Sequence, residues 1–156
     1  MKTDASLTDA IIRRIVQGAD PVYSEVYIYG EPDNMTAVLE KLEEDYGAAH
    51  PCRRVVRITG EEYMERVCQV LLKGKLVNLM FPLEEECGLF IFRDIEKLGG
   101  KESYMELIYG VLDLCLEHHI QLVVTGSVPV KELDCLEDRI RAQLAGCLCC
   151  SLEQVG

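Results

Sequence analysis

The chain has 156 residues, of which 49% are hydrophobic and 28% are charged, so one domain with a buried core is expected and a disordered tail is excluded. The 16 Lys and Arg residues against 27 Asp and Glu residues give a formal net charge of −11, which argues against general binding to nucleic acid or to an anionic membrane. No apolar run is long enough to span a bilayer, and the first residues do not resemble a signal peptide. We therefore expect a cytoplasmic protein with no membrane partner.

The first half of the chain alternates between helical and strand patterns. Apolar residues at helical spacing predict a helix over residues 6–18. The run Val26–Tyr29 predicts a strand that Gly30 ends, and a helix is expected over Thr36–Tyr46. Val55–Ile58 predicts a second strand.

The second half continues this alternation. Thr59 and Glu62 have the spacing of a capping box, which predicts the start of another helix, and Leu89–Phe92 predicts a strand too apolar for one exposed face. The remaining expected elements are a helix over Glu102–His118, a strand over Ile120–Thr125, a helix over Lys131–Leu144 and a last strand over Cys147–Leu152. Doubly buried strands separated by helices indicate βαβ crossovers. The predicted fold is α/β, a three-layer parallel sheet of about five strands with helices on both faces, as a single domain over residues 1–156.

The eight cysteines allow two interpretations. Cys147–Cys150 contains three cysteines near Cys135, which would suit a metal site, but no second C-x-x-C pair lies elsewhere in the chain, and neither His118 nor His119 has a His or Cys four residues further on. A disulfide framework is not expected in a cytosolic protein. We predict no metal, and we interpret Cys147–Cys150 as a buried strand because a free Cys behaves as a small hydrophobe.

The loop after the first predicted strand is where a sheet of this kind binds ligands. Gly30–Ala37, GEPDNMTA, has the position of a Walker A loop, whose pattern is G-x-x-x-x-G-K-[ST]. Only the first glycine is present. Met35, Thr36 and Ala37 stand where the pattern has its second glycine, its lysine and its hydroxyl residue.

The other residues of this loop also oppose phosphate binding. Pro32 lacks a backbone N–H donor, and Glu31 and Asp33 add two negative charges where a polyphosphate would lie. A shifted frame with Thr36 as the magnesium ligand still contains no lysine. We interpret the segment as an ordinary turn between strand and helix, with residual nucleotide binding as the alternative.

Six short motifs follow one another between about Tyr23 and Leu152. Phe90–Glu102, FIFRDIEKLGGKE, resembles a Walker B strand and the turn after it, LLIDDIQFLAGKE. The others are Tyr27–Gly30 against FIYG, Thr59–Tyr63 against TAEEF, Lys73–Leu76 against DGKL, Pro129–Leu133 against PPKEI and Leu136–Arg141 against LEDRLRSR. Together they resemble the AAA+ domain of the bacterial chromosomal replication initiator DnaA family. The resemblance implies a P-loop NTPase fold, restricted to the base subdomain, with no lid and no helix-turn-helix domain.

The resemblance also implies which residues would stand at the family's ATPase positions. Arg93 replaces the first Walker B acid and Asp94 keeps the second, so Arg93 would repel a metal ion, fill its space or pair with Asp94. Ser127 replaces the sensor-type aspartate, and Gln143 replaces the arginine that reaches a neighbouring subunit. The expected result is a degenerate Walker A site with no catalytic residue and no cofactor. Its vestigial positions are Gly30, Thr36, Asp94 and Ser127.

These expectations lead to one functional hypothesis and two alternatives. The hypothesis is a non-catalytic, DnaA-like AAA+ remnant that acts as a protein-interaction or regulatory module in DNA replication initiation or its control. Its partner would be another protein, a second copy or a DnaA-type initiator. The alternatives are a relative that binds ATP or ADP through an altered P-loop, and a fragment that binds single-stranded DNA through Arg53, Arg54 and Arg57. We interpret those arginines as an exposed strand edge and the acidic run Glu84–Glu86 as a solvated face, and nucleic acid is not the expected partner.

Overall fold

The computed structural model describes residues 10, 12–17, 25–62, 65, 87–98, 115, 120–133, 138–146 and 148–152. Its elements are β1 (Glu25–Tyr29), α2 (Pro32–Ala49), β2 (Arg54–Thr59), β3 (Cys87–Arg93), the 3-10 turn η1 (Ile95–Leu98), β4 (Gln121–Gly126), the 3-10 turn η2 (Val130–Glu132), α6 (Asp138–Ala145) and β5 (Leu148–Ser151). Residues 12–17 are also helical. Each of the five predicted strands is present, within one or two residues of its expected ends.

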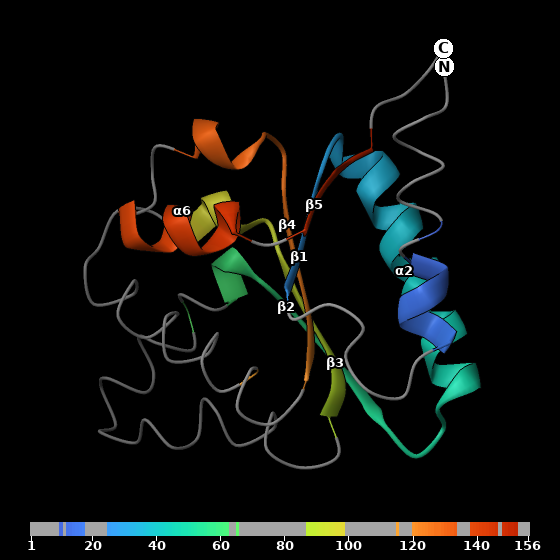
Figure 1. Cartoon of the computed structure of the whole chain (residues 1–156). Coiled ribbons are helices and arrows are strands. Elements are labelled where there is room, and N and C mark those ends of the chain that lie inside the picture. The colour runs from blue at the N-terminus through green and yellow to red at the C-terminus, as the bar shows by residue number, and fades with distance from the viewer. Residues whose placement is uncertain are drawn as a thin grey trace.

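The five strands form one sheet in the order β2-β3-β4-β1-β5, and every neighbouring pair is parallel. In the centre, Val26 of β1 lies opposite Val123 of β4 and Leu148 of β5. The carboxyl ends of all strands therefore lie at one edge of the sheet, which faces the top of Figure 1. We call this edge the carboxyl edge.

Helices cover both faces of the sheet. α2 and the helical segment 12–17 pack on one face, whereas η1, η2 and α6 lie on the other (Figure 1). This arrangement confirms the predicted three-layer α/β fold. No helix in the described part of the chain is long and apolar enough to cross a membrane.

The core explains why α2 forms where it does. Its buried residues recur at spacings of four, three and four, which places them on one stripe of a helix. They are Met35, Leu39, Leu42 and Tyr46. This stripe packs with Val26 and Ile28 of β1, whose side chains are fully buried.

The expected capping box is confirmed at the end of β2. The backbone N–H of Thr59 donates to Glu62 Oε1 at 3.0 Å, and the N–H of Glu62 donates to Thr59 Oγ1 at 3.1 Å. Two free N–H groups at a helix start are thereby satisfied reciprocally. Of the expected helix Glu102–His118, the structure describes only Cys115, which is helical, and the segments Lys73–Leu76 and Glu84–Glu86 lie outside the described residues.

Two predicted helix boundaries were wrong. α2 begins at Pro32 instead of Thr36, because a proline needs no N–H partner in the first helical turn and its φ already suits a helix. The helix expected over Lys131–Leu144 is not continuous: η2 ends at Glu132, the next residue Leu133 has a ψ of 64° that leaves the helical region, and α6 begins at Asp138. Val130 and Leu133 are both buried, and a 3-10 turn places residues three apart on one side.

The cysteine segment forms the expected strand β5, but only part of it is buried. Cys150 is 2% exposed, whereas Cys149 is exposed, as the alternation of a strand requires. Burial raises the pKa of the Cys150 thiol to about 11, and the neighbouring Cys149 contributes in the same direction. The described residues contain no group of His, Cys, Asp and Glu that could hold a metal ion, and Cys135 and Cys147 lie outside them.

Candidate functional site

The connection from β1 to α2 at the carboxyl edge contains only Gly30 and Glu31. α2 starts at Pro32, and the first helical bond runs from the Met35 N–H to the Glu31 carbonyl at 2.9 Å. Met35 is 2% exposed and belongs to the core. The segment expected as a turn up to Ala37 is therefore already helical, and the side chain at the position of the second Walker A glycine points into the protein.

Gly30 is required by packing at this edge. A Cβ placed on Gly30 would lie 2.7 Å from Cβ of Leu152, the residue that follows β5, and φ of Gly30 is 159°. The backbone N–H of Gly30 donates to the Gly126 carbonyl at 3.2 Å, and the N–H of Leu152 donates to the Tyr29 carbonyl at 2.8 Å. The absence of a side chain at Gly30 lets the chain after β5 lie against the end of β1.

Arg93 connects the end of β3 to the first turn of α2. Its Nη2 donates to Thr36 Oγ1 at 2.5 Å and to the Pro32 carbonyl at 3.1 Å, while its Nε lies 3.7 Å from Asp94 Oδ1. Thr36 in turn donates to the Pro32 carbonyl at 3.0 Å. The guanidinium, on a side chain only 15% exposed, thus lies between the Thr36 hydroxyl and the Asp94 carboxylate. Of the arrangements expected for Arg93, the pairing with Asp94 is present as this contact.

Asp94 has an unusual backbone. Its φ of +59° lies in the left-handed region, which Asp tolerates better than most residues. Its N–H donates to Thr125 Oγ1 at 3.2 Å, and Thr125 is almost fully buried in β4. Thr125 therefore fixes the conformation that turns the chain from β3 into η1.

Ser127 follows β4 and is held through its backbone. Its N–H donates to Glu96 Oε1 of η1 at 3.2 Å. The preceding residue, Gly126, has no room for a side chain, because a Cβ would lie 2.2 Å from the Tyr27 hydroxyl. That hydroxyl donates to the Val128 carbonyl at 2.6 Å. Glu96 and Thr125 are thus structural residues of this edge that the motif comparison did not identify; the signals were a lone Thr in an apolar strand and an acid soon after Asp94.

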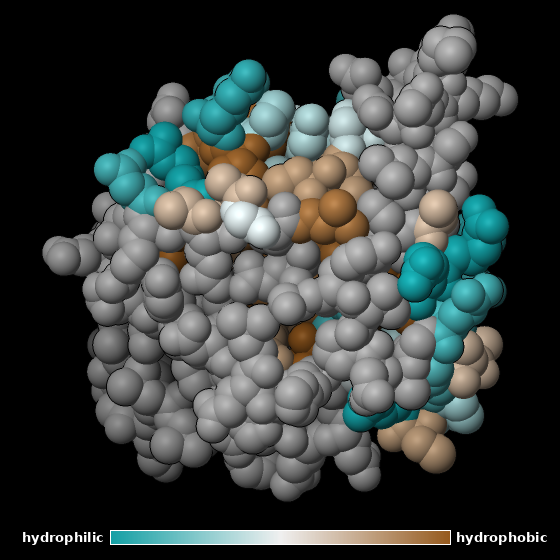
Figure 2. Space-filling view, viewed as in Figure 1, coloured by the Kyte–Doolittle hydropathy of each residue, from teal (hydrophilic) through white to brown (hydrophobic). Residues whose placement is uncertain are grey.

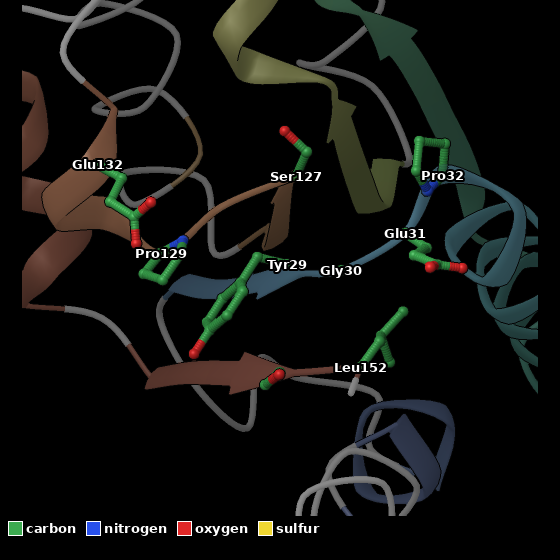
Figure 3. A pocket seen from close by; sticks show the side chains of 9 residues that line it. Tyr29, Gly30, Glu31, Pro32, Ser127, Pro129, Glu132 and Leu152 are labelled. Atoms are coloured by element: carbon green, nitrogen blue, oxygen red, sulfur yellow. The ribbon is translucent and has the colours of Figure 1, made fainter. Parts of the chain in front are cut away.

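A cavity of about 680 Å³ opens between the ends of β1, β4 and β5. It is lined by Tyr29, Gly30, Glu31, Pro32, Ser127, Pro129, Glu132, Ser151 and Leu152 (Figure 3). Of the four expected vestigial positions, Gly30 and Ser127 line this cavity. Thr36 and Asp94 do not, and they are joined to each other through Arg93. The structure therefore divides the predicted site into two parts.

The cavity presents acceptors and few donors. Pro32 and Pro129 have no N–H, and the N–H groups of Gly30, Ser127 and Leu152 are bonded inside the protein. The Glu132 N–H is likewise used, by the Pro129 carbonyl at 2.9 Å. No Lys, Arg or His is among the lining residues that the structure describes, whereas Glu31 and Glu132 both carry exposed carboxylates. A triphosphate needs inward N–H groups and a cation, so these residues do not fit a nucleotide.

The basic cluster expected around β2 is partly engaged in ion pairing. Arg57 Nη1 lies 2.7 Å from Glu43 Oε2 of α2, and Arg54 and Arg57 are both exposed. β2 is an edge strand of the sheet. The interpretation as an exposed strand edge holds for Arg54 and Arg57, whereas Arg53 precedes β2 and is half-buried.

Comparison with known proteins identifies the family. The model of the Bacterial DnaA ATPase domain matches residues 3–151. The chain belongs to this family. The chromosomal replication initiator protein DnaA of Sphingopyxis alaskensis is 26% identical over 142 residues, which cover 90% of the chain but only 31% of that relative. The chain thus spans about a third of the length of this curated DnaA relative.

Solved DnaA structures share the fold. Domain III of the DnaA protein from Thermotoga maritima superposes with a TM-score of 0.87 at 18% identity and covers 98% of the chain, with 63% of that domain matched. A replication initiator DnaA bound to AMPPCP and single-stranded DNA superposes with a TM-score of 0.83 at 18% identity, over 96% of the chain and 46% of that protein. The predicted AAA+ resemblance is confirmed. The expectation that nucleic acid is not a partner is not confirmed, because this structural neighbour is bound to single-stranded DNA.

Proposed function

We propose that the chain is a DnaA-family ATPase domain that does not hydrolyse ATP and that acts by binding a protein partner in the initiation of DNA replication or in its control. The observation that carries this proposal is the position of Arg93. Its guanidinium lies between the Thr36 hydroxyl and the Asp94 carboxylate, with contacts to both.

Electrostatics gives this contact its functional meaning. Phosphoryl transfer in P-loop enzymes uses a magnesium ion that a hydroxyl and an acid hold, with a lysine beside the phosphates. In this chain, a permanent positive charge already occupies the space between Thr36 and Asp94, and a divalent cation there would be repelled. Met35 is buried in the core, and the first turn of α2 contains no lysine. We therefore expect no ATP hydrolysis at the ends of β1 and β3.

The proposal that the chain binds a protein partner rests on the folded domain that it keeps. The sheet, its two helical layers and a strongly acidic composition are all present, so the chain can offer a folded surface without nucleotide chemistry. Its relatives are described as replication initiators. A DnaA-type initiator or a second copy of the chain is the partner that this family membership supports.

A titration tests the proposal directly. The purified chain is titrated with ATP, ADP and Mg²⁺ while the melting temperature is followed, and phosphate release is measured in parallel. A ligand at 100 times its dissociation constant would stabilise the fold by about 2.7 kcal/mol. We expect no shift and no release, and a clear upward shift would refute the lost nucleotide site.

A second candidate function is binding of single-stranded DNA, and it rests on the structural neighbour bound to such DNA. The engagement of Arg57 by Glu43 and the net charge of −11 oppose it. Anisotropy of a labelled oligonucleotide at about 50 and about 200 mM salt decides the matter. Tight binding that weakens steeply with salt would support this candidate, and no binding at the lower salt would eliminate it.

A further inference from the structure

We propose that the cavity at the carboxyl edge receives a lysine or arginine side chain of a partner protein. This inference rests on the proposed function, because it names the chemistry by which a protein would bind there. It depends on three features of the cavity: its hydrogen-bonding character, its charge and its aromatic wall.

The hydrogen-bonding character favours a ligand that brings its own donors. Four lining residues spend their N–H groups inside the protein, and two more are prolines. The described side-chain acceptors of the lining include the carboxylates of Glu31 and Glu132 and the hydroxyls of Tyr29 and Ser127. Ammonium and guanidinium groups consist of donors alone, and they pair with carboxylates through charge-assisted bonds.

The charge of the lining residues favours the same kind of ligand. Glu31 and Glu132 lie at opposite ends of the row of lining residues in Figure 3, with Tyr29 between them. Both residues are exposed and neither has an ion pair among the described contacts. A basic side chain that enters the cavity therefore meets a net negative charge, and no described lining residue carries a positive charge.

Tyr29 supplies a rigid wall for the aliphatic part and the charge of such a side chain. Its ring stacks on that of the buried Tyr27, with 6.0 Å between ring centroids. A cation over the face of a tyrosine ring gains further attraction. Pro129 and Leu152 add apolar surface, and Figure 2 shows apolar surface along the top of the view, above the strand ends. A volume of about 680 Å³ is ample for one long side chain with its flanking backbone.

The experiment uses the full chain labelled with ¹⁵N and two short peptides. One is acetyl-Gly-Arg-Gly-amide, and the other has citrulline in place of arginine, which keeps the shape and removes the charge. We expect the arginine peptide to shift the Gly30 and Ser127 amide signals saturably and the citrulline peptide to bind at least fivefold more weakly. Equal binding of the two peptides, or shifts that avoid both amides, would overturn the proposal.

Matched variants test the residues. Glu31→Gln and Glu132→Gln should each weaken arginine-peptide binding about two- to fivefold, as expected for partly exposed ion pairs. Glu44→Gln makes the same charge change on an exposed position of α2 outside the cavity and should leave binding unchanged. Tyr29→Leu should weaken binding, while Tyr29→Phe, which keeps the ring, should bind within about twofold of wild type. If Glu44→Gln and Glu132→Gln weaken binding equally, the peptide responds only to the net charge of the chain, and the proposed site is refuted.

Two further measurements distinguish failure of this inference from failure of the proposed function. Spermidine that binds much more tightly than the arginine peptide would assign the cavity to a free polyamine and refute a protein side chain as its ligand. Nucleotide binding in the titration above would refute the proposed function itself. No peptide binding together with no nucleotide binding would refute only the present inference.

Discussion

The ends of β1 and β3 lie at the same edge of one sheet, yet their residues depart from the Walker A and Walker B patterns in different ways. At the end of β1 the difference is one of conformation: α2 begins at Pro32, and Met35 is part of the core. At the end of β3 the difference is one of charge: Arg93, the last residue of β3, bonds to Thr36.

This comparison separates two kinds of change. A change of charge concerns a few hydrogen bonds, so a single substitution can undo it. A change of conformation is held by many packing contacts along α2, and a single substitution that restores the glycine cannot restore the loop. Stability measurements on variants at the two strand ends can therefore test whether the two ends really differ in this way.

The largest effect is expected at Met35. Met35→Gly removes a buried side chain and places a glycine in a helix, and we expect it to lower the free energy of unfolding by about 3–5 kcal/mol in urea titrations. Ala37→Gly, at an exposed position of the same helix, should cost only about 1 kcal/mol. Similar costs for the two variants would mean that packing of Met35 does not hold the end of β1.

Gly30→Ala should have the next largest effect. Its added Cβ would overlap with Leu152, and overpacking of this kind costs about 2–3 kcal/mol. Gly47 in α2 has open space around it, so Gly47→Ala should instead stabilise the chain by about 0.5–1 kcal/mol. In a double-mutant cycle, Leu152→Gly, which removes the Cβ that the new side chain would meet, should recover part of the cost of Gly30→Ala, and strict additivity would show that the two residues do not compete for space.

Arg93→Ala tests the charged end, where a smaller effect is expected. Loss of the charge-assisted bonds to Thr36 and the Pro32 carbonyl should lower the free energy of unfolding by about 2 kcal/mol. Lys41→Ala removes a surface ion pair with Asp45 and should cost about 0.5 kcal/mol or less. If Arg93→Ala is as mild as the control, the guanidinium does not hold β3 against α2.

The strands were predictable because burial on both faces produces a simple signal. β1 and β4 are continuous apolar runs, and their boundaries were predicted to within one residue. The start of α2 was missed because Pro32 and Asp33 also occur in loops. Only packing of Met35 on the sheet decides between a loop and a helix there.

The site was less predictable, because its contacts join residues that are distant in sequence. Arg93 and Thr36 are separated by 57 positions, and no local motif connects them. The role of Thr125 depends on the left-handed conformation of Asp94 one strand away. The positions predicted from the motifs all lie at one edge of the sheet, but the division of that edge into a cavity and an arginine contact required the three-dimensional structure.

The smallest effect is expected from the burial of Cys150 in β5, the strand that pairs with β1. Burial raises the pKa of Cys150 from 9.0 to about 11, so in this window the unfolded chain loses a proton that the folded chain keeps. The free energy of unfolding should therefore fall as the pH rises from about 9 toward about 11. Cys150→Ala should flatten this slope in urea titrations, whereas Cys52→Ala, at an exposed position, should not. An unchanged slope in Cys150→Ala would mean that the thiol titrates alike in both states, and that the contact between β5 and β1 admits water.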